Sequence, residues 1–122
     1  MAGMRVGIDL IEIDRVARAL VRHPRFVERV FTPAERAYCL SRANPPQHFA
    51  ARFAGKEAVG KALGFGVPFT WREIEIVGRP VRLTPGFGRT AAWAKRVSAG
   101  GIDLSMTHSK GMAAAVAIVH DA

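Results

Sequence analysis

The stretch QHFAARFAGKEAVGKAL, residues 47–63, decides the fold because it predicts one long helix. Gly64 and Gly66 follow this helix and mark its end, since glycine is common just after the last helical turn. Small side chains recur along the helix at Ala51, Ala54, Ala58 and Ala62. Because such a stripe lets a helix come close to its neighbour, we expect this helix to lie directly against a sheet or another helix.

Five segments outside this helix predict strands. Residues 4–11 (MRVGIDLI) form a short apolar run with β-branched side chains, which predicts a strand buried on both faces. Residues 102–109 alternate between polar and apolar side chains, and residues 112–120 return after a tight turn. Residues 71–77 also alternate, as a half-exposed strand does, and residues 81–83 predict a short partner strand.

Three further helices complete the predicted elements. Residues 12–22 carry apolar side chains at helical spacing. The TPAE stretch at residues 32–35 is a strong helix start, because its threonine can cap the helix and its glutamate completes a capping box. Residues 84–98 predict another helix. The order of elements predicts an α+β fold with a largely antiparallel sheet packed against the long helix, in one domain over residues 1–122.

The composition narrows the class of protein and the class of ligand. The 18 Lys and Arg residues exceed the 10 Asp and Glu residues, and the net charge of +8 implies an anionic partner: nucleic acid, an acidic protein or a polyphosphate. A single cysteine, Cys39, excludes an internal disulfide framework and a cysteine-based zinc site. The apolar runs are too short to span a membrane, and no signal peptide is visible, so we expect a cytoplasmic protein.

Two carboxylates are candidates for chemistry. Asp9 lies within an apolar strand, where it either caps the next helix, pairs with an arginine or binds a metal ion. Glu57 lies mid-helix among small and apolar residues, with Lys61 one turn later, and its simplest interpretation is a surface Glu–Lys pair. If the two acids meet, carboxylates about 4 Å apart repel by roughly 4 kcal/mol at an effective dielectric near 20. A divalent cation would offset this repulsion, and oxygen ligands favour Mg²⁺.

One histidine adds to these candidates. His108 ends the predicted strand just before the turn at residues 109–111. It is either a structural histidine or part of an anion site, in which hydroxyls, a ring N–H and turn amides meet a phosphate. The sequence contains no P-loop, GxGxxG, HExxH, GxSxG or EF-hand pattern.

Three blocks of sequence carry a resemblance to a known family. They are GIDLIEI at residues 7–13, RFAGKEA at residues 52–58 followed by KALG at residues 61–64, and LSMTHS at residues 104–109. Together, in this order and at this spacing, they resemble the holo-acyl-carrier-protein synthases, the small single-domain class of the 4′-phosphopantetheinyl transferases. The resemblance spans nearly the whole chain and implies the fold of that family.

The resemblance also implies an activity. This family transfers the 4′-phosphopantetheine arm of coenzyme A to a serine of apo acyl carrier protein, releases adenosine 3′,5′-bisphosphate, requires Mg²⁺ and supports fatty acid biosynthesis. By position, Asp9 and Glu57 would hold the Mg²⁺, and Glu57 and Lys61 would be catalytic, with Lys61 on the phosphates. Arg52 and His108 would lie near the nucleotide phosphates. Members of this size form homotrimers with active sites between subunits.

The resemblance also implies a partner for the basic face of the first predicted helix. The family docks its acidic carrier protein on this helix, and the matching residues here are Arg15, Arg18, Arg22 and Arg25, with Phe26 as an apolar anchor. A solvated basic face without a partner is the alternative. The chain departs from the family pattern at Gly55 and Gly60, where alanine favours a helix by about 1 kcal/mol each, and at Thr107, where the family more often has serine.

Two other functions remain open at this point. A basic nucleic-acid-binding domain would explain the net charge of +8 and the arginine-rich helix, but it leaves Asp9 without a purpose and lacks a recognisable binding motif. A coenzyme A or nucleotide-binding module without transfer would use the same residues. The sequence does not identify which carrier protein is modified.

Overall fold

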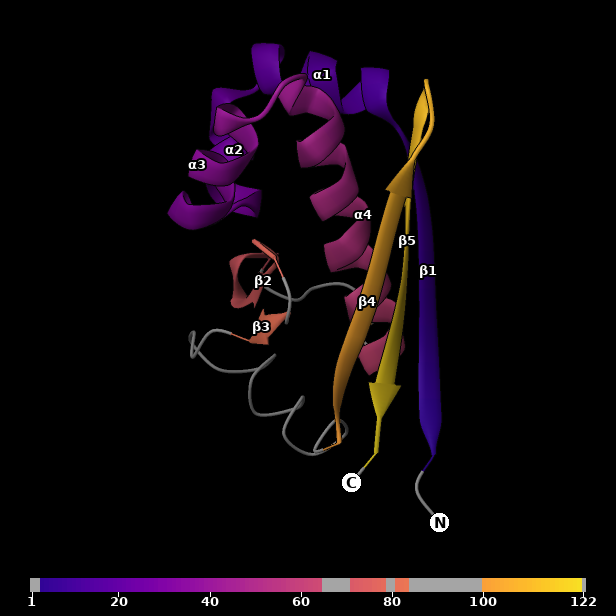
Figure 1. Cartoon of the computed structure of the whole chain (residues 1–122). Helices are drawn as coiled ribbons and strands as arrows, with labels where there is room; N and C mark the ends of the chain where they lie inside the picture. The colour runs from indigo at the N-terminus through magenta and orange to yellow at the C-terminus, as the bar shows by residue number, and fades with distance from the viewer. Residues whose placement is uncertain (1–2, 65–70, 79–80, 84–99, 122) are drawn as a thin grey trace.

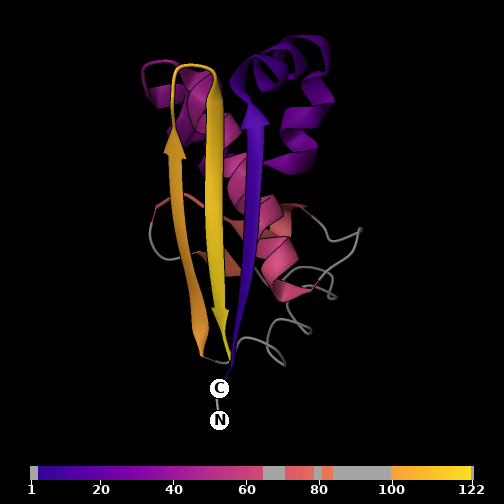
Figure 2. The same cartoon turned by 90° about the vertical axis from the view of Figure 1, so that its right-hand side faces the viewer.

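One helix lying along one sheet forms the centre of the molecule. The structure is a computed structural model that describes residues 3–64, 71–78, 81–83 and 100–121. Helix α4 (Pro45–Leu63) runs along one face of a sheet of three strands (Figures 1 and 2). These strands are β1 (Met4–Glu12), β4 (Gly101–His108) and β5 (Met112–His120). The predicted helix at residues 84–98 lies outside the described residues.

The sheet is antiparallel throughout, in the order β1-β5-β4. The central strand β5 pairs with both neighbours, so that Ala117 stands opposite Gly7 on one side and Leu104 on the other. Helices packed on one face of an antiparallel sheet confirm the predicted α+β class. The predicted strands over residues 102–109 and 112–120 are confirmed to within one residue at each end.

Three short helices gather at the end of the sheet where β1 finishes (Figure 1). They are α1 (Ile13–Arg22), α2 (Pro24–Val30) and α3 (Pro33–Ser41), and the break between the first two falls at Pro24, which takes the first helical position of α2. The predicted capping box of α3 is confirmed. The backbone N–H of Glu35 donates to Thr32 Oγ1 at 3.2 Å, and the backbone N–H of Thr32 donates to Glu35 Oε1 at 2.8 Å.

Helix α4 begins two residues earlier than predicted. Pro45 and Pro46 form its first turn, where a proline costs no hydrogen bond, and Gly64 ends it in the left-handed conformation with φ of 85°. The alanine stripe is buried as expected: Ala54, Ala58 and Ala62 pack with β5 in one hydrophobic cluster. The helix therefore presents small side chains to the sheet and can lie close to it. No helix among the described residues has the length and apolar character that a membrane span requires.

Gly55 has a packing reason that the sequence does not reveal. A Cβ at this position would lie 2.8 Å from Ile76 Cδ1 and 3.3 Å from Met106 Sδ. The helix is therefore crowded here from two sides, by the segment that follows β2 and by β4. The helix propensity lost at Gly55 is offset by this close packing.

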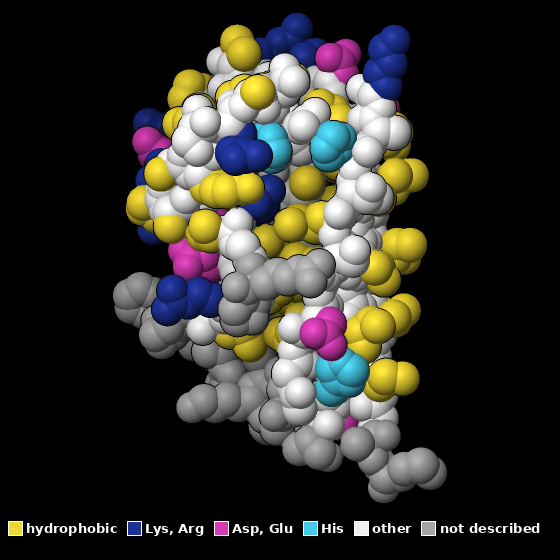
Figure 3. Space-filling view, viewed as in Figure 1, with side chains coloured by type: hydrophobic (Ala, Val, Ile, Leu, Met, Phe, Trp, Pro, Cys, Tyr) yellow, Lys and Arg dark blue, Asp and Glu magenta, His cyan; other side chains and the backbone are white. Residues whose placement is uncertain are grey.

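The prediction that β1 is buried on both faces is wrong. Its inner face lies against α4, where Gly7 is buried. Its outer face is open, and its large apolar side chains are 64–71% exposed: Met4, Val6, Ile8 and Leu10. An apolar run indicates that both faces of a strand favour burial. It does not show whether the same chain buries both faces or a second molecule buries one of them. Hydrophobic side chains accordingly project along the β1 edge of the molecule in Figure 3.

The predicted strand over residues 71–77 is also wrong in its extent. It begins as a 3₁₀ turn at Trp71–Glu73, and the pairing found among the described residues is between Ile74–Glu75 (β2) and Arg82–Leu83 (β3). The carbonyl oxygens of Trp71 and Ile74 both accept hydrogen bonds from Lys56 Nζ. A side chain of α4 therefore takes two of the backbone acceptors in this segment.

A buried ion pair joins α3, α4 and β2. Lys56 Nζ lies 2.8 Å from Glu35 Oε1, and both side chains are 0% exposed. Glu35 Oε2 also accepts a hydrogen bond from the backbone N–H of Ile76 at 2.7 Å. Burial lowers the pKa of Lys56, and the negative charge of Glu35 opposes that change. Hydrogen bonds satisfy both charged groups. Each buried charge also needs the opposite charge of its partner, so loss of one side chain would leave the other charge uncompensated.

We predict that Lys56→Met lowers the free energy of unfolding by about 3–5 kcal/mol, because it leaves Glu35 charged and unpaired in the interior. Urea unfolding followed by circular dichroism measures this loss. Lys56→Met combined with Glu35→Gln should cost less than the sum of the single changes. Asp14→Asn, at the exposed pair with Arg18, is the control and should cost at most about 0.5 kcal/mol. An equal effect of Lys56→Met and Asp14→Asn would contradict the role given to the buried pair.

Candidate functional site

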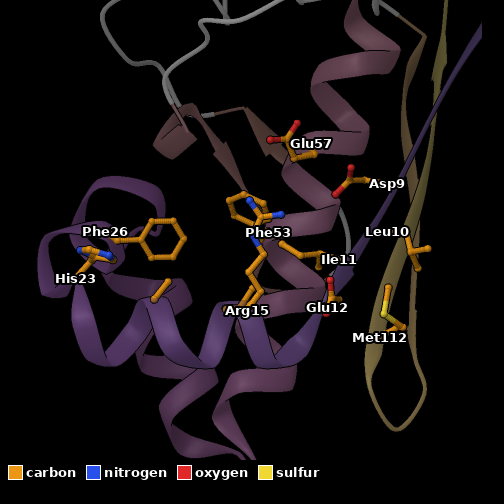
Figure 4. Close-up of a pocket in the computed structure, with 12 residues that line it drawn as sticks. Asp9, Leu10, Ile11, Glu12, Arg15, His23, Phe26, Phe53, Glu57 and Met112 are labelled. Carbon is orange, nitrogen blue, oxygen red and sulfur yellow. The ribbon is translucent and has the colours of Figure 1, made fainter.

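The contact between β1 and α4 brings an acid from each element to one place. Asp9 points from β1, and Glu57 points from the facing side of α4 (Figure 4). Lys61 follows Glu57 by one helical turn, and its Nζ lies 3.3 Å from Asp9 Oδ1. The same Nζ donates to the carbonyl oxygen of Ile8 at 2.9 Å. The structure therefore unites the three candidates that the sequence singled out in its first two blocks.

The electrostatics of this group show that its charges interact. The pKa of Glu57 is raised above its ordinary value, first by burial and second by the negative charge on Asp9, while Lys61 acts in the opposite direction. The Asp9 side chain is 18% exposed, so water screens its charge only partly. A carboxylate whose ionisation is opposed by burial and by a second carboxylate beside it is arranged to receive a cation.

The donor set fits Mg²⁺ better than it fits a zinc ion. Among the described residues, no group of three or more His, Cys, Asp and Glu side chains could hold a metal ion by itself. Mg²⁺ commonly binds one or two carboxylates and completes its shell with waters and substrate phosphates, whereas zinc sites use at least three protein ligands, often nitrogen or sulfur. Asp9 and Glu57 would supply the protein ligands of such an ion.

A cavity of about 670 Å³ opens beside the two acids, between β1, α1, α2 and α4 (Figure 4). Asp9, Glu12 and Glu57 give it an acidic side, and Arg15 reaches it from α1. Phe53 contributes an aromatic wall. The cavity can therefore accept a molecule with both a charged and an apolar part, next to the place where a cation would bind.

Phe26 lines this same cavity and faces inward. Its ring lies 6.2 Å from the ring of Phe31 and 6.0 Å from the ring of Phe53, centroid to centroid. The expected apolar anchor is thus part of the cavity wall. Of the arginines on the basic face, Arg15 lines the cavity too, while Arg18, Arg22 and Arg25 are exposed on the surface beyond it.

Arg52 and His108 lie away from the acid pair, and neither lines the cavity beside Asp9 and Glu57. Arg52 is buried on another side of α4, where its Nη2 donates to the carbonyl oxygen of Val77 at 3.0 Å. Its guanidinium stacks 4.3 Å above the centre of the Tyr38 ring. His108 Nε2 lies 3.3 Å from Gln47 Nε2, beside a second cavity of about 690 Å³.

Arg52 belongs to a basic cluster that the sequence analysis missed. Burial lowers the pKa of His48, and the positive charges of Arg52 and Arg42 lower it further. The charge of His108 acts on His48 in the same direction. Histidine and basic side chains gather on the upper part of the face shown in Figure 3. The only signal in the sequence was the spacing of His48 and Arg52, which puts them one helical turn apart.

Comparisons with known proteins agree with each other. The model of the 4′-phosphopantetheinyl transferase superfamily matches residues 5–116. A holo-[acyl-carrier-protein] synthase of Moorella thermoacetica is 48% identical over 121 residues, which cover 95% of this chain and 93% of that protein.

Solved structures give the same result. The acyl carrier protein synthase of Mycobacterium tuberculosis superimposes with a TM-score of 0.74 and 37% identity, over 98% of this chain and 100% of that one. The ACPS–CoA complex of Chronobacterium ammoniagenes gives a TM-score of 0.80 and 29% identity, over 98% of both chains. The likeness therefore extends through fold and sequence over nearly the full length. The chain belongs to the holo-acyl-carrier-protein synthases of the 4′-phosphopantetheinyl transferase superfamily.

Proposed function

We propose that this protein transfers the 4′-phosphopantetheine arm of coenzyme A to a serine of an apo acyl carrier protein, in the service of fatty acid biosynthesis. Adenosine 3′,5′-bisphosphate is the second product. The observation that carries this proposal is the meeting of Asp9, Glu57 and Lys61 beside a cavity, in a chain of this family. A surface Glu–Lys pair would not need an acid from a second element.

The proposed chemistry needs alignment and charge neutralisation more than covalent catalysis. Asp9 and Glu57 would hold Mg²⁺, which when bound neutralises the pyrophosphate and orients it. Lys61 carries a positive charge at the same place and would contact the phosphates, stabilising the charge that moves onto the leaving bisphosphate. Glu57 also lines the cavity, so this carboxylate is our candidate for the group that accepts the proton of the carrier's serine.

Arg52 and His108 are proposed to contact the nucleotide phosphates from a neighbouring copy. Within one chain they lie away from the acids: His108 is exposed beside the second cavity, and the buried Arg52 is close enough to His48 to lower the pKa of that histidine. A phosphate-rich ligand bound between two copies could meet the acid pair and Lys61 of one chain and the basic cluster of the next. This arrangement would reconcile the residues that the resemblance implies with their places in the structure.

The open apolar face of the sheet supports assembly of identical chains. Met4, Val6, Ile8 and Leu10 expose large side chains in a row along β1, and Val116 of the adjacent strand is 37% exposed. Contiguous apolar surface of this kind marks an interaction site. We propose that copies of the chain cover it in a homotrimer, as in the family.

The basic face of α1 is proposed to dock the acidic carrier protein. Arg15 lies at the rim of the cavity, and Arg22 and Arg25 are exposed nearby. A carrier held there would present its serine toward Asp9 and Glu57. Electrostatic docking of this kind raises the rate of association and weakens as salt screens the charges.

The proposed function is tested by mixing the protein with coenzyme A, Mg²⁺ and an apo acyl carrier protein, followed by mass spectrometry of the carrier. We expect the carrier to gain the mass of one phosphopantetheine. Asp9→Asn and Glu57→Gln should each abolish the gain, because each change removes one of the two carboxylates proposed to fix the position of the ion. Glu28→Gln, an exposed change on α2, is the matched control and should keep full activity.

Two results would contradict transfer and favour another function. Tight binding of coenzyme A with no mass gain on any carrier would indicate a binding module without transfer. Salt-sensitive binding of DNA or RNA, with no affinity for coenzyme A, would favour a nucleic-acid-binding domain, since counterion release makes such binding fall steeply with salt.

We predict that Arg22→Glu raises KM for the carrier protein several-fold and leaves binding of coenzyme A unchanged. The added acid repels an acidic partner on the docking face but lies outside the acid pair. Steady-state kinetics at varied carrier concentration measure the effect, which should shrink at high salt. Arg82→Glu on β3 makes the same change of charge on another exposed residue and is the control. Equal effects of the two reversals would mean that only net charge matters.

We predict that Ile8→Glu converts the trimer into monomers, because it places a charge in the row of exposed apolar side chains on β1. Sedimentation equilibrium measures the assembly. Leu40→Glu is the matched control, since Leu40 is 66% exposed but lies on α3, away from the sheet. A wild-type protein that sediments as a monomer, or a trimer that survives Ile8→Glu, would refute the proposed interface.

A further inference from the structure

We infer that Gly7 is a positioning residue for the metal site, because the absence of a side chain there sets the separation between the acid of β1 and the acid of α4. The inference rests on the proposed function, since it concerns the two carboxylates proposed to hold Mg²⁺. Gly7 touches neither the ion nor the substrate. It acts through the distance between two backbones.

The contact at Gly7 is between backbone and backbone. A Cβ at this position would lie 1.9 Å from the carbonyl oxygen of Ala58 and 2.7 Å from the backbone nitrogen of Ala62. Distances under 3.0 Å do not occur for real Cβ atoms, so any side chain would force the strand and the helix apart. Backbone conformation is not the reason for this glycine, since Gly7 is not among the described residues with positive φ.

This contact lies directly between the groups of the site. Asp9 is two residues after Gly7, so its side chain leaves the strand on the same face. Glu57 directly precedes Ala58 and Lys61 directly precedes Ala62. These two alanines are the helical residues that a Cβ at Gly7 would meet. Lys61 Nζ also reaches the carbonyl oxygen of Ile8, which joins strand and helix at this level. The spacing at Gly7 therefore determines how far Asp9 stands from Glu57.

The neighbouring strand carries a side chain at the same level under the helix. Ala117 of β5 pairs with Gly7 in the antiparallel register and is also buried under α4. The helix tolerates a methyl group at Ala117 but none at Gly7. It therefore approaches more closely the strand that carries Asp9 than the strand that does not.

The test compares metal binding in Gly7→Ala with binding in the wild-type protein. Free Mn²⁺ counted by electron paramagnetic resonance gives the affinity without any turnover. We expect Gly7→Ala to bind Mn²⁺ about tenfold or more weakly, a loss typical of changes to residues that orient the ligands of a metal ion. Circular dichroism and the melting temperature show whether the variant is folded.

Two controls separate positioning from general destabilisation. Ala117→Val adds bulk at the same level of the sheet, under α4 but on the strand without Asp9, and should keep its Mn²⁺ affinity within about twofold. Gly111→Ala, in the turn between β4 and β5, meets nothing within 4 Å and should change neither stability nor affinity. If Gly7→Ala does not fold, Ala58→Val adds bulk at the buried helical residue whose carbonyl oxygen faces Gly7.

Two outcomes would overturn the inference. One is a folded Gly7→Ala, or in its place a folded Ala58→Val, with wild-type affinity for Mn²⁺. The other is an equal loss of affinity in Ala117→Val. Asp9→Asn distinguishes failure of the metal site itself: if that variant binds Mn²⁺ as the wild type does, the ion lies elsewhere and the proposed function loses its metal site.

Discussion

The rest of the structure depends on the close contact between β1 and α4. Strand and helix meet backbone to backbone at Gly7, and the small residues Ala58 and Ala62 of the helix make this possible. Asp9 and Glu57 come from elements that are separated by most of the N-terminal half of the chain. The contact between β1 and α4 brings these two acids together, and the proposed metal site depends on it. The buried pair of Lys56 and Glu35 holds the opposite side of the same helix to α3 and β2.

Strand β1 serves two surfaces at once because its side chains alternate. Gly7 and Asp9 face the helix and the site, whereas Ile8 and its outer neighbours face away and stay exposed in a single chain. Covering the outer face with a second copy would hold β1 from both sides. Assembly and the geometry of the acid pair are therefore linked through one strand in the proposed account, even though the outer side chains touch no part of the site.

Local patterns in the sequence predicted local structure well. The capping box at Thr32, the end of α4 at Gly64 and the last two strands follow from turn chemistry and periodicity. The sequence did not show which distant segments contact one another. It did not show that one face of β1 is uncovered within a single chain, or that Lys56 Nζ donates hydrogen bonds to the carbonyl oxygens of Trp71 and Ile74. The same is true of the site. The sequence blocks identified Asp9, Glu57 and Lys61 as candidates together with Arg52, but the structure shows that Arg52 points to another side of α4.

Crystals grown with Mn²⁺ and coenzyme A test the central claim most directly, because anomalous scattering locates the ion without any assumption about activity. The account predicts one peak within coordination distance of both Asp9 and Glu57, with phosphate oxygens of the coenzyme completing the shell. A peak held by neither carboxylate, or bound coenzyme with its phosphates away from this acid pair, would contradict it.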